Sequence, residues 1–207
     1  MSNSDQDDVD PSWPNAASHI FGHRASTHFL NVDLGYLQGD ERLYEIAYRE
    51  AVDILYRQAI QEPSACQWLI LPLGYLWRHT LELQLKMAIA RSLEVAGRDL
   101  DKKERQRLHV HKLLPLWQLT KEQIEAIGVS TEPLGVEDFE RLLGDVDALD
   151  PEATGFRFHA ARNGEPSLSP RDRSVDLENF HKVFCELYTF VDCLNEELKH
   201  IIVDGGP

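Results

Sequence analysis

Residues 72–96 read PLGYLWRHTLELQLKMAIARSLEVA and are followed by Gly97, and this stretch decides the fold class. It is long and strongly apolar, Pro72 suits the first turn of a helix, and Gly97 suits the position just after the last turn. A helix that is apolar around most of its circumference is usually buried. The stretch therefore predicts the central helix of a helical bundle, and a start further back, through Trp68 and Ile70, is left open.

Helical periodicity also marks the segments on either side of this central helix. Residues 41–62 carry apolar side chains at three- and four-residue steps, with Asp40 as a candidate N-cap and Pro63 as the stop. Further helices are predicted over residues 108–119, where a bend at Pro115 is left open, over 136–149 and over 176–202. No segment of useful length alternates with the period of a strand, so the predicted fold class is all-α.

The length and the local composition predict how the chain is organised. A chain of 207 residues fits one domain with a tail. Residues 1–18 are rich in Asp and Pro and poor in apolar side chains, so we expect a flexible, disordered acidic tail there and a single domain over 19–203. Residues 150–172 are rich in Gly, Pro and Arg and predict an ordered loop, in which one short extended piece is left open.

Several classes of protein are excluded by what the sequence lacks. It has no run of about 18 apolar residues and no secretory signal pattern, so we expect no membrane association and a cytoplasmic location. Three cysteines without a CxxC pair argue against a disulfide framework, and Cys185 and Cys193, eight residues apart, are predicted to be buried free thiols. His19, His23 and His28 lack carboxylate or thiolate neighbours, so neither a metal nor another cofactor is expected.

The formal net charge of −14 is distributed unevenly along the chain. Residues 63–128 carry ten basic and seven acidic side chains, whereas residues 129–207 carry seven basic and 17 acidic ones. A protein that coats nucleic acid with its whole surface is not expected, because repulsion would slow the encounter. A local basic site in the middle third is left open, and so is a solvated helix face that is basic by chance.

Three polar residues of the central helix share one face. His79, Glu82 and Lys86 stand at i, i+3 and i+7, and Arg78 is spaced to reach Glu82 at i+4. Three interpretations remain open: a solvent-facing stripe, a buried structural network, or a cleft that binds phosphate or moves a proton. We expect the three residues to lie within hydrogen-bonding reach of one another or of the 150–172 loop, for example Arg157.

A second constellation lies in a basic segment, whose members are Arg105, Arg107, His109, His111 and Lys112. Such side chains are those that metal-independent RNA cleavage needs. One imidazole deprotonates the 2′-hydroxyl, and a guanidinium stabilises the charge on the phosphorane. The alternative is a basic helix end followed by a histidine that is bonded to a backbone carbonyl.

The central helix and the segment that follows resemble the HEPN superfamily (higher eukaryotes and prokaryotes nucleotide-binding). The resemblance is carried by YLWRHTLELQLK at 75–86 and by HKLLPLW at 111–117. The sequence GFRF at 155–158, after Asp150 and Pro151, is similar to a loop of prokaryotic defence-associated members. The likeness extends over about residues 40–200 and implies an up-and-down bundle of four to five main helices that usually dimerises.

The resemblance also implies an activity. Many members are metal-independent RNases of toxin–antitoxin, abortive-infection and CRISPR systems, with an active site made of an Arg, four to six residues and a His. In this chain Arg105, followed by the polar Gln106, and His111 match that spacing. The supporting residues are then Arg78, His79, Glu82, Lys86, Arg107, His109 and Arg157.

Two functions from different classes follow from these observations. The first is an RNase effector that cuts RNA in antiviral defence or as a toxin. The second is a non-catalytic binding or regulatory module that assembles with a partner enzyme or nucleotide-binding subunit encoded in the same operon. The acidic residues 129–207 favour the second, and the basic middle third favours the first. In both cases a homodimer is expected, with Trp68, Trp77 and Trp117 as candidate anchors.

Overall fold

The computed structural model describes residues 40–130, 135–161, 163–168 and 174–204. From Asp40 onward the chain forms one compact unit. The described helices are α1 (Glu41–Gln61), the 3₁₀ turn η3 (Pro63–Ala65), α2 (Cys66–Ala96), α3 (Lys102–Leu108), α4 (Leu113–Ala126), α5 (Val136–Leu149) and α6 (Leu177–Asp204). The all-α helical bundle is thus confirmed. The predicted tail over 1–18 and the domain start at residue 19 lie outside the described residues.

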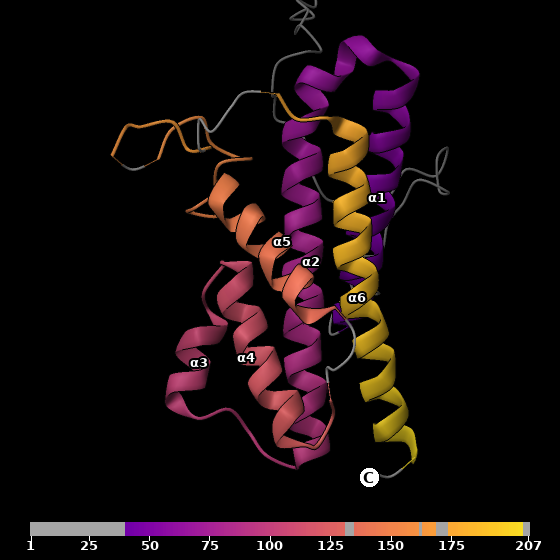
Figure 1. Ribbon diagram of the computed structural model, residues 1–207, viewed down its shortest axis with the longest axis vertical. Coiled ribbons are helices and arrows are strands. Elements are labelled where there is room, and N and C mark those ends of the chain that lie inside the picture. The colour runs from indigo at the N-terminus through magenta and orange to yellow at the C-terminus, as the bar shows by residue number, and fades with distance from the viewer. Residues whose placement is uncertain (1–39, 131–134, 162, 169–173, 205–207) are drawn as a thin grey trace, which may run out of the picture. The chain divides into compact units, whose positions relative to one another are not determined.

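The bundle is built around α2, which packs against α1, α4 and α6. Figure 1 shows α1, α2 and α6 running alongside one another, with α3 and α4 beside one half of α2 and α5 crossing obliquely. None of the helices in the described part of the chain is long and apolar enough to cross a bilayer. In the predicted loop region, the described residues contain no strand but one isolated bridge, between Ala160 and Pro166.

Helix α2 starts earlier than its proline suggested. It begins at Cys66, directly after η3, so Pro72 lies inside the helix rather than in its first turn, and the start further back that the sequence left open is confirmed. A proline cannot donate to the carbonyl four residues before it, which here is that of Trp68. Both Pro72 and Trp68 are exposed, so water can take the place of the missing donor. At the other end Gly97 has a φ of 61°, the left-handed conformation expected of a helix-ending glycine.

Aromatic rings fill the core on both sides of α2. Trp77 of α2 stacks on Phe184 of α6 with a centroid distance of 5.6 Å, and Trp117 of α4 meets Phe139 of α5 edge-on at 4.8 Å. Trp77 and Trp117 are fully buried, so the prediction that they anchor a dimer was wrong. Of the three candidate tryptophans, only Trp68 is exposed, at 69%.

The cysteines of α6 do not share a face. Cys185 is half-buried and Cys193 is exposed, so the prediction of two buried thiols was wrong for Cys193 and holds only in part for Cys185. Eight residues at about 100° each turn the helix by two full circles and about 80° more, which carries the second side chain away from the core.

Candidate functional site

A cleft opens where the middle of α2 meets the segment before α4 and the loop after α5. Its volume is about 150 Å³, and it is lined by Tyr75, Arg78, His79, Glu82, His111, Ala153 and Arg157. Five of these residues were singled out from the sequence, and Tyr75 and Ala153 were not. The cleft joins His79 and Glu82 of α2 with His111 of the basic segment and with Arg157 of the predicted loop. Lys86, the third residue of the shared helix face, is not among the residues that line it.

An imidazole–carboxylate pair lies in this cleft. Nδ1 of His111 is 2.9 Å from Oε1 of Glu82, and Nζ of Lys86 is 2.6 Å from the same oxygen. The Glu82 side chain is 11% exposed, whereas that of His111 is 65% exposed. With Glu82 ionised, neutral His111 donates from Nδ1 and keeps the lone pair of Nε2 for a ligand.

The Glu82 carboxyl is held in its ionised form. Burial alone raises its pKa, but the hydrogen bonds from Lys86 and His111 outweigh burial, so the pKa lies below its usual value. A carboxylate at this place fixes the imidazole in one tautomer and stabilises its protonated form. Glu82 and Lys86 are thus paired as the shared helix face predicted.

His79 lies in the same cleft but among aromatic rings. The ring of Tyr48 meets it edge-on at a centroid distance of 4.5 Å, and the ring of Tyr75 is nearly parallel to it at 5.8 Å. Burial lowers the pKa of His79, and the nearby Glu82 carboxylate offsets this only in part. His79 is therefore neutral at pH 7. Tyr48 was not singled out from the sequence, because no local spacing links α1 to the stripe.

Arg78 does not make the i+4 pair with Glu82 that its spacing suggested. Its Nη2 donates instead to Oδ1 of Asp147 at 2.8 Å and to the backbone oxygen of His111 at 3.0 Å. The side chain of Arg78 is 4% exposed, and that of Asp147 is 13% exposed. The arginine is thus a buried anchor that ties α5 and the His111 segment to α2.

Asp147 completes this anchor at the start of α4. Its Oδ1 accepts from the backbone N–H of Leu113 at 3.0 Å, and its Oδ2 accepts from that of Leu114 at 2.9 Å. A carboxylate at a helix N-terminus also interacts favourably with the helix dipole. Asp147 therefore caps α4 from another helix, a role that no sequence signal near residue 113 could reveal.

The loop after α5 brings Arg157 to the cleft. The Arg157 guanidinium lies 5.3 Å above the ring of Tyr75 and 5.5 Å from that of Phe158. Its Nη2 donates to the backbone oxygen of Ala153 at 3.3 Å. The side chain is exposed, so its charge is available to a ligand.

Two features hold this loop against α2. Oδ1 of Asp150 accepts from the backbone N–H groups of Thr154 at 2.9 Å and of Gly155 at 2.8 Å. The buried ring of Phe156 packs on Gly74, where a Cβ would lie only 2.4 Å from the ring. Gly74 therefore permits the close approach that places Arg157 beside Tyr75.

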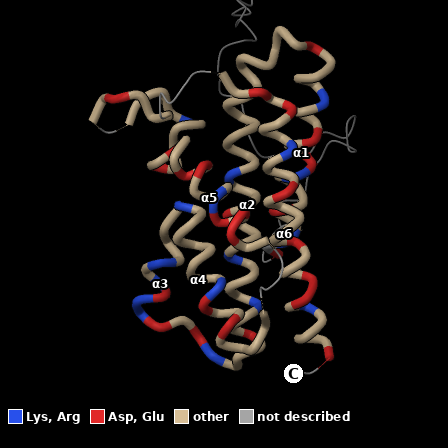
Figure 2. Tube along the Cα trace, in the orientation of Figure 1, with Lys and Arg blue, Asp and Glu red and all other residues tan. Residues whose placement is uncertain are grey.

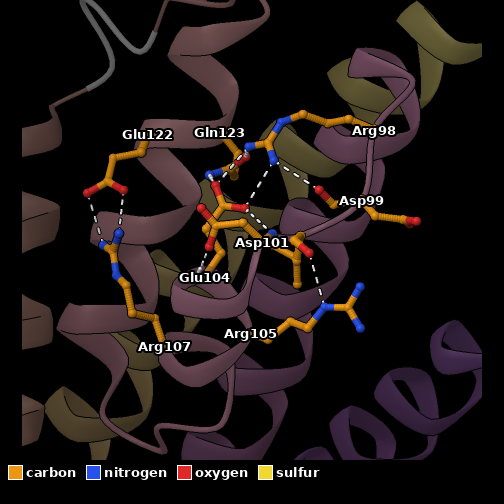
Figure 3. A network of polar contacts seen from close by, with 9 residues as sticks. Arg98, Asp99, Asp101, Glu104, Arg105, Arg107, Glu122 and Gln123 are labelled. Carbon is orange, nitrogen blue, oxygen red and sulfur yellow. Dashed lines mark hydrogen bonds and ion pairs between the residues drawn. The ribbon is translucent and has the colours of Figure 1, made fainter.

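The basic segment around α3 forms a different structure, a surface network (Figure 3). Nε of Arg105 donates to the backbone oxygen of Leu100 at 3.0 Å. Arg107 makes a bidentate pair with Glu122 of α4, and the Nη2–Oε1 distance is 2.9 Å. His109 is exposed at the end of α3. None of the three basic residues lines the cleft, so the structure does not bring Arg105 and His111 together in it.

The same network ties α3 to the end of α2. Arg98 pairs with Glu104 at 2.8 Å, and Glu104 also closes the capping box of α3 with Asp101. These hydrogen bonds, with that from Arg98 the strongest, lower the pKa of Glu104 to about 2. Figure 2 shows acidic and basic residues beside one another here rather than in one basic strip.

Neither possible metal ligands nor similarity to known proteins narrows the choice of function. Among the described residues, no group of three or more His, Cys, Asp and Glu side chains is placed to hold a metal ion. The three histidines at 19, 23 and 28 lie outside those residues. Comparison of the chain with protein-family models, curated proteins and solved structures returned no match.

Proposed function

We propose that this chain is a HEPN-like protein of a prokaryotic defence or toxin–antitoxin system that cleaves RNA without a metal. The observation that carries the proposal is the pair of His111 and Glu82 in a cleft beside the exposed Arg157. A base oriented by a carboxylate, next to a cation for the phosphate, is the arrangement that this chemistry needs.

In the proposed reaction, Nε2 of His111 removes the proton of a 2′-hydroxyl, and the 2′-oxygen attacks the adjacent phosphorus. Glu82 accepts the hydrogen bond from Nδ1 and stabilises the imidazolium that forms. Arg157 stabilises the charge on the phosphorane oxygens. The bond from phosphorus to the 5′-oxygen then breaks, and that oxygen takes its proton from the imidazolium, which leaves a 2′,3′-cyclic phosphate and a 5′-hydroxyl.

Of the two residues in the Arg-to-His spacing motif, Arg105 and His111, only His111 has a catalytic role in this reaction. His111 remains the base, while the charge-stabilising role moves from Arg105 to Arg157, because Arg157 lines the cleft and Arg105 does not. Arg78 has a structural role in this account, since its guanidinium is already bonded to Asp147 and to the His111 carbonyl.

The test is an RNA cleavage assay with the purified full chain in the presence of EDTA. His111→Ala is expected to lower the rate about 10²- to 10⁴-fold. His109→Ala is the matched control, because it removes a nearby exposed imidazole that does not line the cleft. Cleavage is expected to weaken with added salt. Intact RNA with wild type under all conditions contradicts the proposal.

A second candidate function is a non-catalytic module that assembles with a partner subunit. It is favoured by the carboxylates that already pair with Arg98, Arg107 and Lys121, which reduces the positive charge offered to RNA. In either function we propose a homodimer, and light scattering at micromolar concentration tests it. A protein that neither cleaves nor binds RNA, but forms a stable complex with the product of a neighbouring gene, favours this second function.

A further inference from the structure

Next to the cleft, the loop presents an aromatic side chain to solvent. Phe158 is 57% exposed, although its neighbour Phe156 is buried in the core. The guanidinium of Arg157 is within cation–π distance both of Phe158, at 5.5 Å, and of Tyr75, a cleft residue, at 5.3 Å. The exposed ring is therefore connected to the cleft through a single side chain.

The backbone that carries Phe158 is anchored on both sides. The N–H groups of Arg157 and Phe158 both donate to the Thr154 oxygen at 2.9 Å, and the Ser167 N–H donates to the His159 oxygen at 3.3 Å. Gly155 packs so closely that a Cβ there would lie 2.6 Å from the Leu168 side chain. The loop thus holds the backbone of Phe158 in a defined place, although the Phe158 ring does not contribute to the core.

An exposed aromatic ring beside a guanidinium plane is suited to an unpaired nucleobase. Bases in single strands stack on aromatic side chains and on arginine guanidinium groups, and each such stack contributes strongly to affinity. A base within a duplex has both faces covered by its neighbours, so it cannot use such a ring.

We propose that Phe158 and Arg157 form a base-binding subsite that holds one unpaired base of an RNA strand whose phosphate lies in the cleft. The proposal rests on the proposed function and adds to it a residue that determines where the strand is bound. Because a larger ring system stacks more strongly, the subsite prefers a purine to a pyrimidine. Arg157 then contacts both the base and the phosphate.

The test measures binding separately from cleavage. Short fluorescein-labelled oligomers of 2′-O-methyluridine, with and without one central 2′-O-methyladenosine, lack the 2′-hydroxyl that the reaction needs. Fluorescence anisotropy of wild type is expected to show tighter binding of the adenine-containing oligomer. Phe158→Ala is expected to weaken binding about 5- to 150-fold and to remove the preference for adenine.

Matched variants separate stacking from charge. Phe158→Tyr keeps the ring and is expected to retain both the affinity and the preference. Phe158→Ala is expected to leave the slope of log K against log salt unchanged, whereas Arg157→Ala is expected to reduce it by about one unit or less. Circular dichroism checks that each variant is folded.

The result that overturns the subsite is a Phe158→Ala variant that binds both oligomers as tightly as wild type or keeps the adenine preference. A wild type that binds neither oligomer also overturns it. RNA cleavage by wild type together with unaltered binding by Phe158→Ala contradicts the subsite alone. Binding that depends on Phe158 without any cleavage supports the subsite and contradicts the nuclease.

Discussion

The network around α3 and the cleft on α2 both combine basic and acidic side chains, but they use them differently. In the α3 network, Arg98 and Arg107 each have a carboxylate of their own on the protein surface. In the cleft, the single carboxylate of Glu82 serves both Lys86 and His111, while Arg157 remains available. The basic composition of residues 98–112 therefore did not identify the site. The site is identified instead by the contact of one residue of this segment, His111, with Glu82 of the central helix.

The largest effect on stability is expected from the anchor under the cleft. Arg78→Ala removes the buried partner of Asp147 and is expected to lower the free energy of unfolding by about 3–5 kcal/mol. Urea unfolding followed by circular dichroism measures it. Arg105→Ala, an exposed residue of α3, is the control and is expected to change little. Equal stability of the two variants would contradict the burial of the Arg78 pair.

A smaller effect is expected within the cleft itself. Glu82→Ala removes the hydrogen bonds from Lys86 and His111, and we expect a loss of about 1–3 kcal/mol. The loss is limited because the His111 side chain is 65% exposed and water can solvate it. Thermal unfolding at pH 7 measures the change. A Glu82→Ala protein as stable as wild type would show that the pair is absent in solution.

The histidines give the stability a pH dependence. Burial lowers the pKa of His79 and of His181 below the usual 6.5, so the unfolded chain binds protons more readily than the folded one. The free energy of unfolding is therefore expected to fall as the pH is lowered through about 6.5. Denaturant unfolding between about pH 7.5 and pH 5.5 measures the slope, and His79→Phe should reduce it. A rise in stability over this range would be the opposite of the expected sign.

The smallest effect is expected in the α3 network. Arg107→Ala breaks a surface ion pair with Glu122, and such pairs contribute less than about 1 kcal/mol. The same unfolding measurement, repeated at high salt, should show an even smaller difference because salt screens exposed charges. A loss as large as that of Arg78→Ala would remove the distinction between the two regions.

Helical periodicity was sufficient to predict most of the fold. The predicted ranges 41–62 and 136–149 match α1 and α5 closely, because their apolar faces and caps are local signals. Pro72 does not mark the start of α2, because an exposed helix end tolerates a proline that a buried one would not. Cys193 was wrongly predicted to be buried, because eight residues do not return a helix to the same face.

The site was predictable only where its residues lie on one helix. The face shared by His79, Glu82 and Lys86 follows from helical spacing alone. The capping of α4 by Asp147 joins residues 33 and 34 positions apart, and no sequence pattern reports such a contact. The separation of Arg105 from His111 could not be predicted either, because the turn between α3 and α4 decides which side chain reaches the cleft on α2.

The most direct test of the account compares the two regions by activity. Arg157→Ala and Arg105→Ala each remove one exposed arginine, one beside the cleft and one on α3. RNA cleavage in EDTA is expected to fall at least about tenfold with Arg157→Ala and to remain close to wild type with Arg105→Ala. The opposite order, with cleavage lost in Arg105→Ala and kept in Arg157→Ala, would contradict the assignment of the site to the cleft.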